Sequence, residues 1–107
     1  MGQVHWTEIA LADLKEVREY IARDSAYYAA AFVGRVRDSA ASLNHLPRRC
    51  RIVPEFDDPT VRDMIIGKYR LIYSIADHDN VYILAFIHGA RDLEKLWDEE
   101  NRRDPRA

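Results

Sequence analysis

The sequence predicts a single α+β domain in which a hairpin of two helices covers a mainly antiparallel sheet. Apolar residues recur at helical spacing through the first half of the chain, and strand-like apolar runs with polar turns between them fill the second half. The chain has 107 residues, of which 48% are hydrophobic and 32% are charged. That length and composition suit one globular domain with one core. The expected element order is a short N-terminal strand, the helical hairpin and then the sheet (β-α-α-β-β-β).

The first helix is predicted directly after a short strand at residues 3–6. Thr7 is placed to cap this helix, and Glu8 is placed to interact with the positive end of its dipole. The apolar residues of one helix face then follow at spacings of four, three and four: Ala10, Leu14, Val17 and Ile21. The charged residues between them, Asp13 included, are expected on the side that faces solvent.

A second helix is predicted after Asp24 and Ser25, which are typical turn and N-cap residues. Its apolar residues continue at helical spacing as far as Leu46, and Pro47 ends it. Because the link between the two helices is short, we expect them to lie side by side as a helical hairpin. The aromatic and apolar residues of both helices are interpreted as core.

The second half of the chain is predicted to supply the sheet. Residues 52–56 are a short strand candidate, and residues 61–66 are a further strand. The strongest strand signals are residues 69–76 and 81–87, because both carry apolar side chains on alternate and intervening positions, as a strand covered on two faces requires. Residues 77–80 are a polar turn, so these two strands are expected to form an antiparallel β-hairpin at the centre of the sheet.

The chain is expected to divide into a domain over residues 1–92 and a polar C-terminal extension over residues 93–107. Leu93, Leu96 and Trp97 form a narrow apolar stripe, which predicts a short helix that docks weakly. The end of the chain is expected to be partly disordered.

The charge balance disfavours a general nucleic-acid-binding protein. Sixteen Lys and Arg against eighteen Asp and Glu give a net charge of −2, whereas such proteins usually carry a clear excess of positive charge. A locally basic stretch nevertheless runs from Arg48 to Arg70. The single cysteine, Cys50, excludes an internal disulfide and is interpreted as a structural thiol. With no signal-peptide pattern and no apolar run long enough to cross a bilayer, we expect a soluble cytoplasmic protein.

No cofactor and no metal is expected. The sequence contains no Walker loop, dinucleotide-binding fingerprint, zinc-ligand spacing or nucleophile elbow. The histidines are too scattered to predict a metal site; they are His5, His45, His78 and His88.

One group of residues is a candidate catalytic site. Arg70 lies near the start of one central strand, while His88 and Arg91 lie at the end of the strand expected to pair with it. These two ends are neighbours in an antiparallel β-hairpin, so the side chains are expected together at one end of the sheet, with Arg62 close by. An imidazole beside guanidiniums can bind a phosphate and move a proton, which is the minimum for metal-independent RNA cleavage.

The same residues also have purely structural interpretations. A histidine that ends a buried strand is commonly a hydrogen-bonded structural residue. Arg70 is suited to a salt bridge with an acid such as Asp63, or with a partner protein. Tyr69 and Tyr73 share one face of their strand and are interpreted as core or interface aromatics rather than proton donors.

Four pieces of the chain together carry a family pattern that covers nearly all of it up to Asp92. They are Trp6-Thr7-Glu8 with Ala10-x-x-Asp13-Leu14, Leu46-Pro47 with Arg51-Ile52-Val53-Pro54-Glu55, Gly67-x-Tyr69-Arg70-Leu71-Ile72-Tyr73, and Ile83-Leu84-x-x-Ile87-His88-Gly89-x-Arg91. These pieces resemble the ParE/RelE superfamily of toxins from bacterial type II toxin–antitoxin systems. The polar extension after Asp92 is longer than a compact ParE-like protein requires.

The resemblance implies a toxin that a cognate antitoxin, ParD-like or similar, neutralises in a hetero-oligomeric complex. The antitoxin would fold as it wraps the helical hairpin and the sheet. ParE-like members bind and poison DNA gyrase without being nucleases, whereas RelE-like members cleave messenger RNA on the ribosome. The Pro54-Glu55 pair and the ending His88-Gly89-x-Arg91 look ParE-like, and the acidic net charge suits a protein target. Gyrase inhibition is therefore favoured.

Each alternative assigns its own residues. In the ParE-like interpretation, binding of the antitoxin or the target is expected at Arg49, Arg51, Arg70 and Arg91, and the basic stretch receives acidic antitoxin residues. In the RelE-like alternative, a metal-independent endoribonuclease, the catalytic residues are His88, Arg70 and Arg62. A stand-alone binding module, or a related protein without toxicity, is the third alternative.

Overall fold

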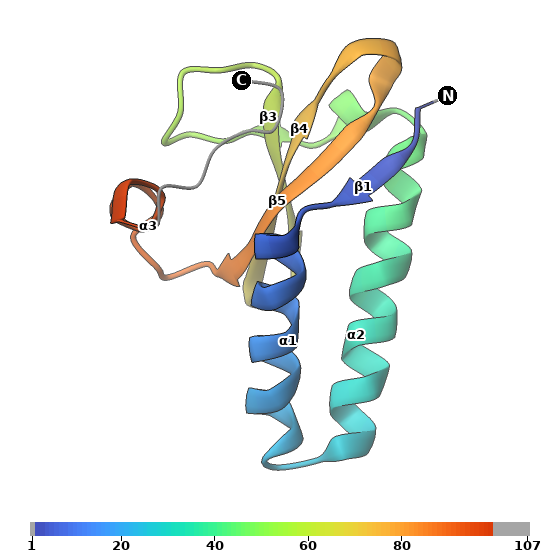
Figure 1. Ribbon diagram of the computed structural model, residues 1–107, viewed down its shortest axis with the longest axis vertical. Helices are drawn as coiled ribbons and strands as arrows, with labels where there is room; N and C mark the ends of the chain where they lie inside the picture. Colours follow the sequence, from blue (N-terminus) through green and yellow to red (C-terminus); the bar gives the residue numbers. More distant parts are fainter. Residues whose placement is uncertain (1, 100–107) are drawn as a thin grey trace.

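A computed structural model, which describes residues 2–99, confirms the α+β architecture, with a helical hairpin packed on a five-stranded sheet (Figure 1). The elements are β1 (Val4–Trp6), α1 (Glu8–Ala22), α2 (Ala26–Ala41), β2 (Arg51–Ile52), β3 (Val61–Ile66), β4 (Tyr69–Ile75), β5 (Val81–His88) and α3 (Leu93–Glu99). Their order across the sheet is β1-β5-β4-β3-β2, with β1 parallel to β5 and the other described pairs antiparallel. The expected β-hairpin, β4 with β5, lies within the sheet and has neighbours on both sides. No helix within residues 2–99 has the length and hydrophobicity needed to cross a membrane.

Both long helices begin where the sequence predicts, because each N-cap side chain binds the backbone of the first turn. Thr7 Oγ1 accepts a hydrogen bond from the N–H of Ala10 (3.2 Å) and donates one to the carbonyl of Ile83 (2.8 Å), so the cap also ties α1 to β5. Ser25 Oγ accepts a hydrogen bond from the N–H of Tyr28 (3.0 Å).

The second helix and the strand after it are shorter than expected. α2 ends at Ala41, and two 3-10 turns, Ser42–Asn44 and Pro47–Arg49, replace its last predicted turns. Serine and asparagine side chains compete with helical backbone bonding, which explains the early end. The expected strand at residues 52–56 is reduced to β2, because Pro54 has no N–H for a ladder and the chain turns there.

The sheet is covered on both faces by two separate hydrophobic clusters. The helical hairpin packs on one face over residues that include Leu71, Tyr73 and Phe86. α3 and the loop after β2 contribute to the second cluster on the other face, where Leu93 and Leu96 are buried. Two residues of the predicted apolar stripe, Leu93 and Leu96, therefore belong to the hydrophobic core.

Asp13 corrects the expectation that the charged residues of α1 face solvent. Its side chain is 8% exposed, and its Oδ2 accepts a hydrogen bond from the backbone N–H of Phe86 (3.0 Å). β1 pairs with β5 only as far as Ile83. The Asp13 carboxylate therefore supplies a hydrogen-bond acceptor for a backbone N–H of β5 that lies beyond the end of β1, and this bond holds α1 against the sheet.

Candidate functional site

Arg70 and His88 lie at the same end of the sheet but on opposite faces. Tyr69 pairs with His88 across β4 and β5, and their ring centroids are 5.5 Å apart. Arg70 pairs with Ile87, and consecutive residues of a strand point to opposite faces. The expected cluster of Arg70 with His88 and Arg91 therefore does not form.

Arg70 belongs to a buried ion-pair network on the face away from the helical hairpin. Only 5% of the residue is exposed, and its guanidinium binds Asp63 (Nη2 to Oδ2, 2.7 Å) and Glu55 (2.7 and 2.9 Å). Arg51 binds the fully buried carboxylate of Asp63 as well (2.6 and 3.0 Å). Hydrogen bonds with Glu55 and then Asp63 raise the pKa of Arg70, and the bond to Arg70 lowers the pKa of Glu55. The salt-bridge interpretation of Arg70 is thus confirmed.

Arg62 and Arg49 are also engaged within the chain. The Arg62 guanidinium donates hydrogen bonds to the backbone carbonyls of Pro59, Arg48 and Cys50 (2.8, 2.9 and 2.9 Å). The Arg49 guanidinium donates to the carbonyl of His45 (2.6 Å) and to the hydroxyl of Ser42 (2.7 Å), which closes the turns after α2. Arg48 pairs with Asp79 (2.6 Å). The arginines of the basic stretch therefore have partners inside the fold.

His88 instead borders a cleft under the tip of the helical hairpin, where the ends of α1 and α2 meet the β3–β4 turn. The cleft has a volume of about 430 Å³ and is lined by Tyr20, Ile21, Tyr28, Phe32, Arg35, Gly67, Lys68, Tyr69 and His88. Arg91 lines an adjoining hollow of about 170 Å³, which shares Tyr20, Tyr69 and His88 with the first. We call the two together the hairpin-tip cleft. Its cations are Arg35, Lys68 and Arg91.

Gly67 lines the hairpin-tip cleft, and Gly89 directly follows the lining residue His88. Gly67 opens the two-residue turn between β3 and β4 with φ of 60°, a conformation that favours glycine at this position of a β-turn. The N–H of Gly89 donates a hydrogen bond to the carbonyl of Lys68 (2.8 Å), and a Cβ on Gly89 would lie 3.3 Å from that oxygen. Gly89 thus lets the end of β5 approach the turn closely.

The His88 imidazole has one nitrogen engaged. The backbone N–H of Ala90 donates a hydrogen bond to Nδ1 (3.0 Å), which assigns Nδ1 as the acceptor and leaves Nε2 to carry the proton. Burial raises the pKa of Tyr69, and the neighbouring Tyr20 adds a smaller effect in the same direction, so the Tyr69 phenol stays protonated at neutral pH. Within residues 2–99, no group of three or more His, Cys, Asp or Glu side chains is arranged to hold a metal ion.

The tip of the helical hairpin extends beyond the end of the sheet (Figure 1). It carries exposed aromatic side chains. Tyr20, Tyr27 and Tyr28 are 63%, 86% and 61% exposed. The Arg23 guanidinium lies 5.7 Å from the centroid of the Tyr20 ring. Exposed aromatic residues beside arginines are typical of protein–protein contacts.

The interpretation of helix aromatics as core is wrong for these tyrosines. A signal was available, because Tyr20 falls outside the apolar spacing of α1, and Tyr27 and Tyr28 precede that of α2.

Comparison with known proteins gives consistent matches over this fold. A family model described as the ParE toxin of type II toxin–antitoxin systems, parDE, matches residues 4–93. Toxin RelE2 of Caulobacter vibrioides is 36% identical over 92 residues, which cover 85% of this chain and 99% of that protein.

Two solved structures are also similar. One is the chromosomal ParDE TA system from P. aeruginosa, with a TM-score of 0.67 and 19% identity over 82% of this chain and 96% of that chain. The other is the toxin–antitoxin complex RelBE2 from Mycobacterium tuberculosis, with a TM-score of 0.59 and 25% identity over 81% of this chain and 96% of that chain.

Proposed function

Because the chain belongs to the family of ParE toxins of type II toxin–antitoxin systems, we propose that it inhibits DNA gyrase and is neutralised by a cognate antitoxin. The two similar solved structures are described as a toxin–antitoxin system and a toxin–antitoxin complex, which supports an antitoxin partner for this chain. Gyrase acts on chromosomal DNA, so the proposed site of action is the cytoplasm.

The observation that carries the choice of gyrase is the separation of Arg70 from His88 by the sheet. Cleavage of RNA needs a proton acceptor, a proton donor and a group that stabilises developing charge, all near one phosphate. The guanidiniums of Arg70 and Arg62 are hydrogen-bonded within the fold, and Nδ1 of His88 is occupied by a backbone N–H. This arrangement supports a protein that acts by binding rather than by cutting RNA.

We assign gyrase binding to the hairpin-tip cleft and the tyrosines around it. Tyrosine and arginine are the residue types that most often dominate the energy of protein–protein contacts. Tyr20 and Tyr28 present large aromatic surfaces to a partner, and Arg35, Lys68 and Arg91 add positive charge beside them. The net charge of −2 suits a protein surface better than a nucleic acid.

Ribosome-dependent cleavage of messenger RNA is the second candidate function, and the 36% identity to Toxin RelE2 favours it. In that case, His88 would act with Lys68 and Arg91, which border the same cleft, instead of Arg70 and Arg62.

A direct assay separates the two candidates. The purified chain is added to DNA gyrase with relaxed plasmid and, in parallel, to translating ribosomes with a defined messenger RNA. We expect supercoiling to be inhibited, gyrase–DNA cleavage complexes to accumulate and the RNA to stay intact. Cleaved RNA with normal supercoiling would reject the proposal in favour of the second candidate.

A matched pair of variants tests the assigned surface. Tyr20→Ala combined with Tyr28→Ala is expected to weaken gyrase inhibition by at least about 10-fold, the loss typical of an interface hot spot. Ile65→Ala is the control, because Ile65 is 57% exposed but lies on β3 outside the cleft. Equal inhibition by the tyrosine variant and the control would place the gyrase contact elsewhere.

A further inference from the structure

The larger hollow of the hairpin-tip cleft is lined by side chains that can bind an anion. Arg35 and Lys68 are exposed there, and within residues 2–99 neither side chain takes part in an ion pair or a side-chain hydrogen bond. His88 adds a donor, because its Nδ1 accepts the N–H of Ala90 and Nε2 carries the proton. Among the residues that the structure describes, no Asp or Glu lines this hollow. It therefore offers unpaired positive charge to a ligand.

The same hollow presents aromatic rings to solvent. Tyr20 and Tyr28 line it and are 63% and 61% exposed. Tyr69 and Phe32 line it as well, but their rings pack on each other and on Phe86 inside the fold. A planar ligand would therefore stack on Tyr20 or Tyr28. The hollow has a volume of about 430 Å³, which lies within the range of about 300–1,000 Å³ that small-ligand sites occupy.

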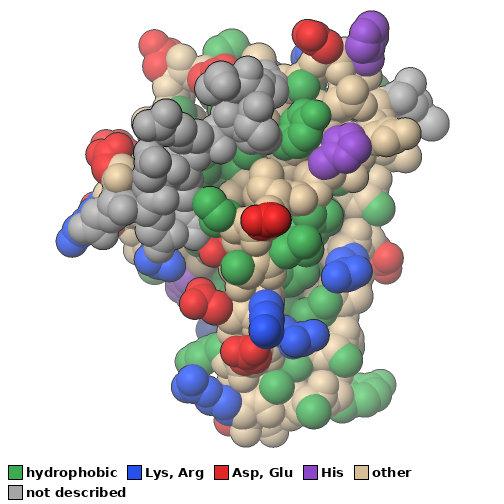
Figure 2. Space-filling view, in the orientation of Figure 1, with side chains coloured by type: hydrophobic (Ala, Val, Ile, Leu, Met, Phe, Trp, Pro, Cys, Tyr) green, Lys and Arg blue, Asp and Glu red, His purple; other side chains and the backbone are tan. Residues whose placement is uncertain are grey.

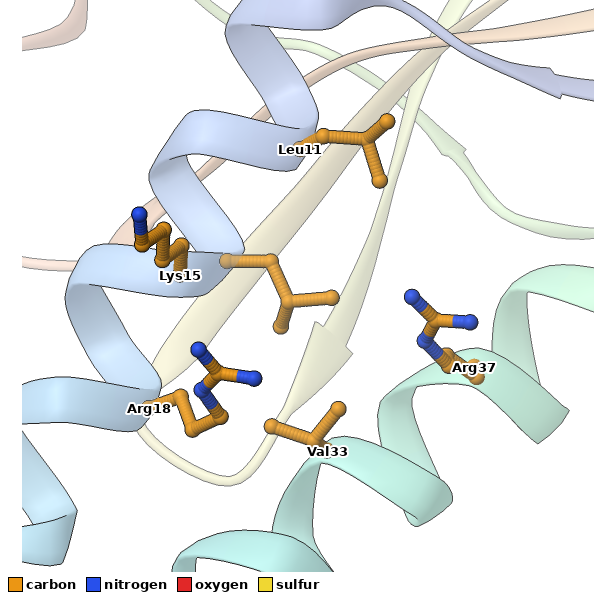
Figure 3. A pocket seen from close by; sticks show the side chains of 6 residues that line it. Leu11, Lys15, Arg18, Val33 and Arg37 are labelled. Carbon is orange, nitrogen blue, oxygen red and sulfur yellow. The ribbon is translucent and has the colours of Figure 1, made fainter.

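Unpaired cations also occur elsewhere on the helical hairpin, where Figure 2 shows Lys and Arg side chains over the two helices. A groove of about 220 Å³ lies between α1 and α2, and we call it the interhelical groove. In Figure 3, Arg18 and Arg37 reach into it from opposite helices, while Lys15 lies at its rim. The other described residues that line it are Leu11, Leu14 and Val33. The interhelical groove can therefore attract an anion, but it has no described aromatic side chain on which a planar ring could stack.

The combination of aromatic rings and unpaired cations in the hairpin-tip cleft matches the chemistry of a nucleotide. A nucleobase stacks on tyrosine whatever its sequence, because every base has a π-face, and the attached phosphate binds Lys and Arg. A base within a duplex is already stacked on its neighbours, so the nucleotide must be unpaired. Contacts along a whole DNA backbone would require a clear excess of positive charge, which a chain of net charge −2 lacks. One phosphate requires only the local charge of Arg35 and Lys68.

We infer that the hairpin-tip cleft binds one unpaired nucleotide of a DNA strand, with the base against Tyr20 or Tyr28 and the phosphate on Arg35 and Lys68. This inference rests on the proposed function, because gyrase cuts and opens DNA and so presents unpaired nucleotides to the toxin. The surface that the toxin recognises is then composed of gyrase and DNA together. One nucleotide supplies few contacts, so free DNA binds weakly and the toxin engages DNA where gyrase holds it.

The test measures binding of the full chain to a single-stranded DNA oligonucleotide in the absence of gyrase. A dye-labelled strand gives the affinity by fluorescence anisotropy. A second strand carries 5-iododeoxyuridine, which crosslinks under ultraviolet light to aromatic side chains that it stacks on, and mass spectrometry identifies the residue. The same strands within gyrase–DNA complexes, and a duplex of the same sequence, complete the comparison.

Two double variants separate the cleft from the overall charge of the chain. Arg35→Glu combined with Lys68→Glu alters the cleft, and Arg18→Glu combined with Arg37→Glu makes the same change in net charge at the interhelical groove. Circular dichroism checks both folds. If either double variant does not fold, Lys68→Gln and its matched control Lys15→Gln replace the pair, since both lysines are exposed.

We expect crosslinks at Tyr20 or Tyr28 with the free strand and with the strand that gyrase holds. The cleft double variant should bind the strand about 10-fold more weakly than the unaltered chain, and the groove double variant within about threefold. Lys68→Gln should bind about fivefold more weakly, and Lys15→Gln within about twofold. The duplex should bind at least about 10-fold more weakly than the single strand, because its bases are not available for stacking.

Equal losses in the two double variants would show that overall charge attracts the strand, and they overturn the inference. Equal affinity for the duplex, or crosslinks only to residues outside the cleft, also overturn it. Displacement of the strand by an equimolar peptide of alternating Asp and Phe would replace the nucleotide with a protein segment as the occupant of the cleft.

The supercoiling assay distinguishes failure of this inference from failure of the proposed function. If the unaltered chain inhibits gyrase but crosslinks to neither the free strand nor the gyrase-held strand, the inference is wrong and the proposed function stands. If the chain leaves gyrase fully active, the proposed function is wrong, and the inference fails with it even where the free strand binds.

Discussion

Arg70 and His88 project from opposite faces of the sheet, although Arg70 pairs with the residue that immediately precedes His88 in β5. One of these side chains is locked into a buried network, and the other borders an open cleft. Substitution of Arg70 should therefore lower the stability of the fold, whereas substitution of His88 should change only the lining of the cleft.

Arg70→Ala should destabilise the fold by about 3 kcal/mol, because it leaves the buried carboxylate of Asp63 with only one of its two arginines. Arg51→Ala is the comparison, and a loss of about 1 kcal/mol is expected because half of that side chain is exposed and its pairing is screened. Urea unfolding followed by circular dichroism measures both. Equal losses, or no loss at Arg70, would contradict a dominant role for the buried pair.

His88→Ala should weaken the inhibition of DNA gyrase by no more than about 10-fold, because His88 contributes one side chain to the lining of the hairpin-tip cleft that we assign to gyrase. A general acid or base, by contrast, contributes about 10²- to 10⁴-fold to a rate. Growth arrest on induced expression and the supercoiling assay are the two measurements. If growth arrest by a folded His88→Ala variant falls by about 100-fold or more, the loss expected for a proton-transfer group, while its gyrase inhibition is retained, RNA cleavage would be favoured.

Asp13→Ala should cost about 1–3 kcal/mol, because the N–H of Phe86 would lose its acceptor in a buried position. Asp13→Asn keeps a side-chain oxygen and should retain most of the stability. Hydrogen exchange at the Phe86 amide reports on the bond directly. If that amide is equally protected in both variants, the proposed fastening of α1 to β5 is wrong.

Tyr73→Phe should destabilise the protein by about 1–2 kcal/mol, because the buried Tyr73 hydroxyl donates a 2.6 Å hydrogen bond to the carbonyl of Pro47. This bond holds the turn after α2 against β4. Tyr69→Phe is a matched control on the same face of the same strand, where a change below about 0.5 kcal/mol is expected. Thermal unfolding of both variants tests the difference.

The free energy of unfolding should decrease as the pH is lowered in the acid range, partly because the carboxylate of Glu55 becomes protonated. Arg70 lowers the folded-state pKa of this carboxyl below its ordinary value of 4.5, so ionised Glu55 contributes stability above about pH 4.5. That contribution is lost as the pH falls through the lowered folded-state pKa. Glu55→Gln should be less stable than the unaltered chain at pH 7 and should show a flatter decline below pH 4.5. Parallel declines in the two proteins would exclude this contribution.

The fold was largely predictable because the spacing of apolar residues along the sequence follows the buried face of each element. The spacing of Ala10, Leu14, Val17 and Ile21 identifies the inner face of α1. Apolar side chains on both faces of β4 and β5 identify these strands as the centre of the sheet. Element ends were less predictable. α2 stops at Ala41, where the Ser42 hydroxyl donates a hydrogen bond to the backbone carbonyl of Ser39 and so competes with helical bonding. The spacing of apolar residues gives no information about such local hydrogen bonds.

The candidate site was only partly predictable, because strand pairing predicts which ends meet but not which face a side chain uses. Arg70 and His88 do share one end of the sheet, as expected. Their faces depend on the register, which pairs Tyr69 rather than Arg70 with His88. The partners of Arg62 are backbone carbonyls from distant residues, and no sequence pattern indicates such contacts.

The strands at the two margins of the sheet are brief, with three residues in β1 and two in β2. Such margins expose few unsatisfied backbone groups, so they are poor templates for the strand-by-strand growth that leads to aggregation. An isolated copy of the toxin, newly made or just released from its inhibitor, is thereby less prone to polymerise through its sheet.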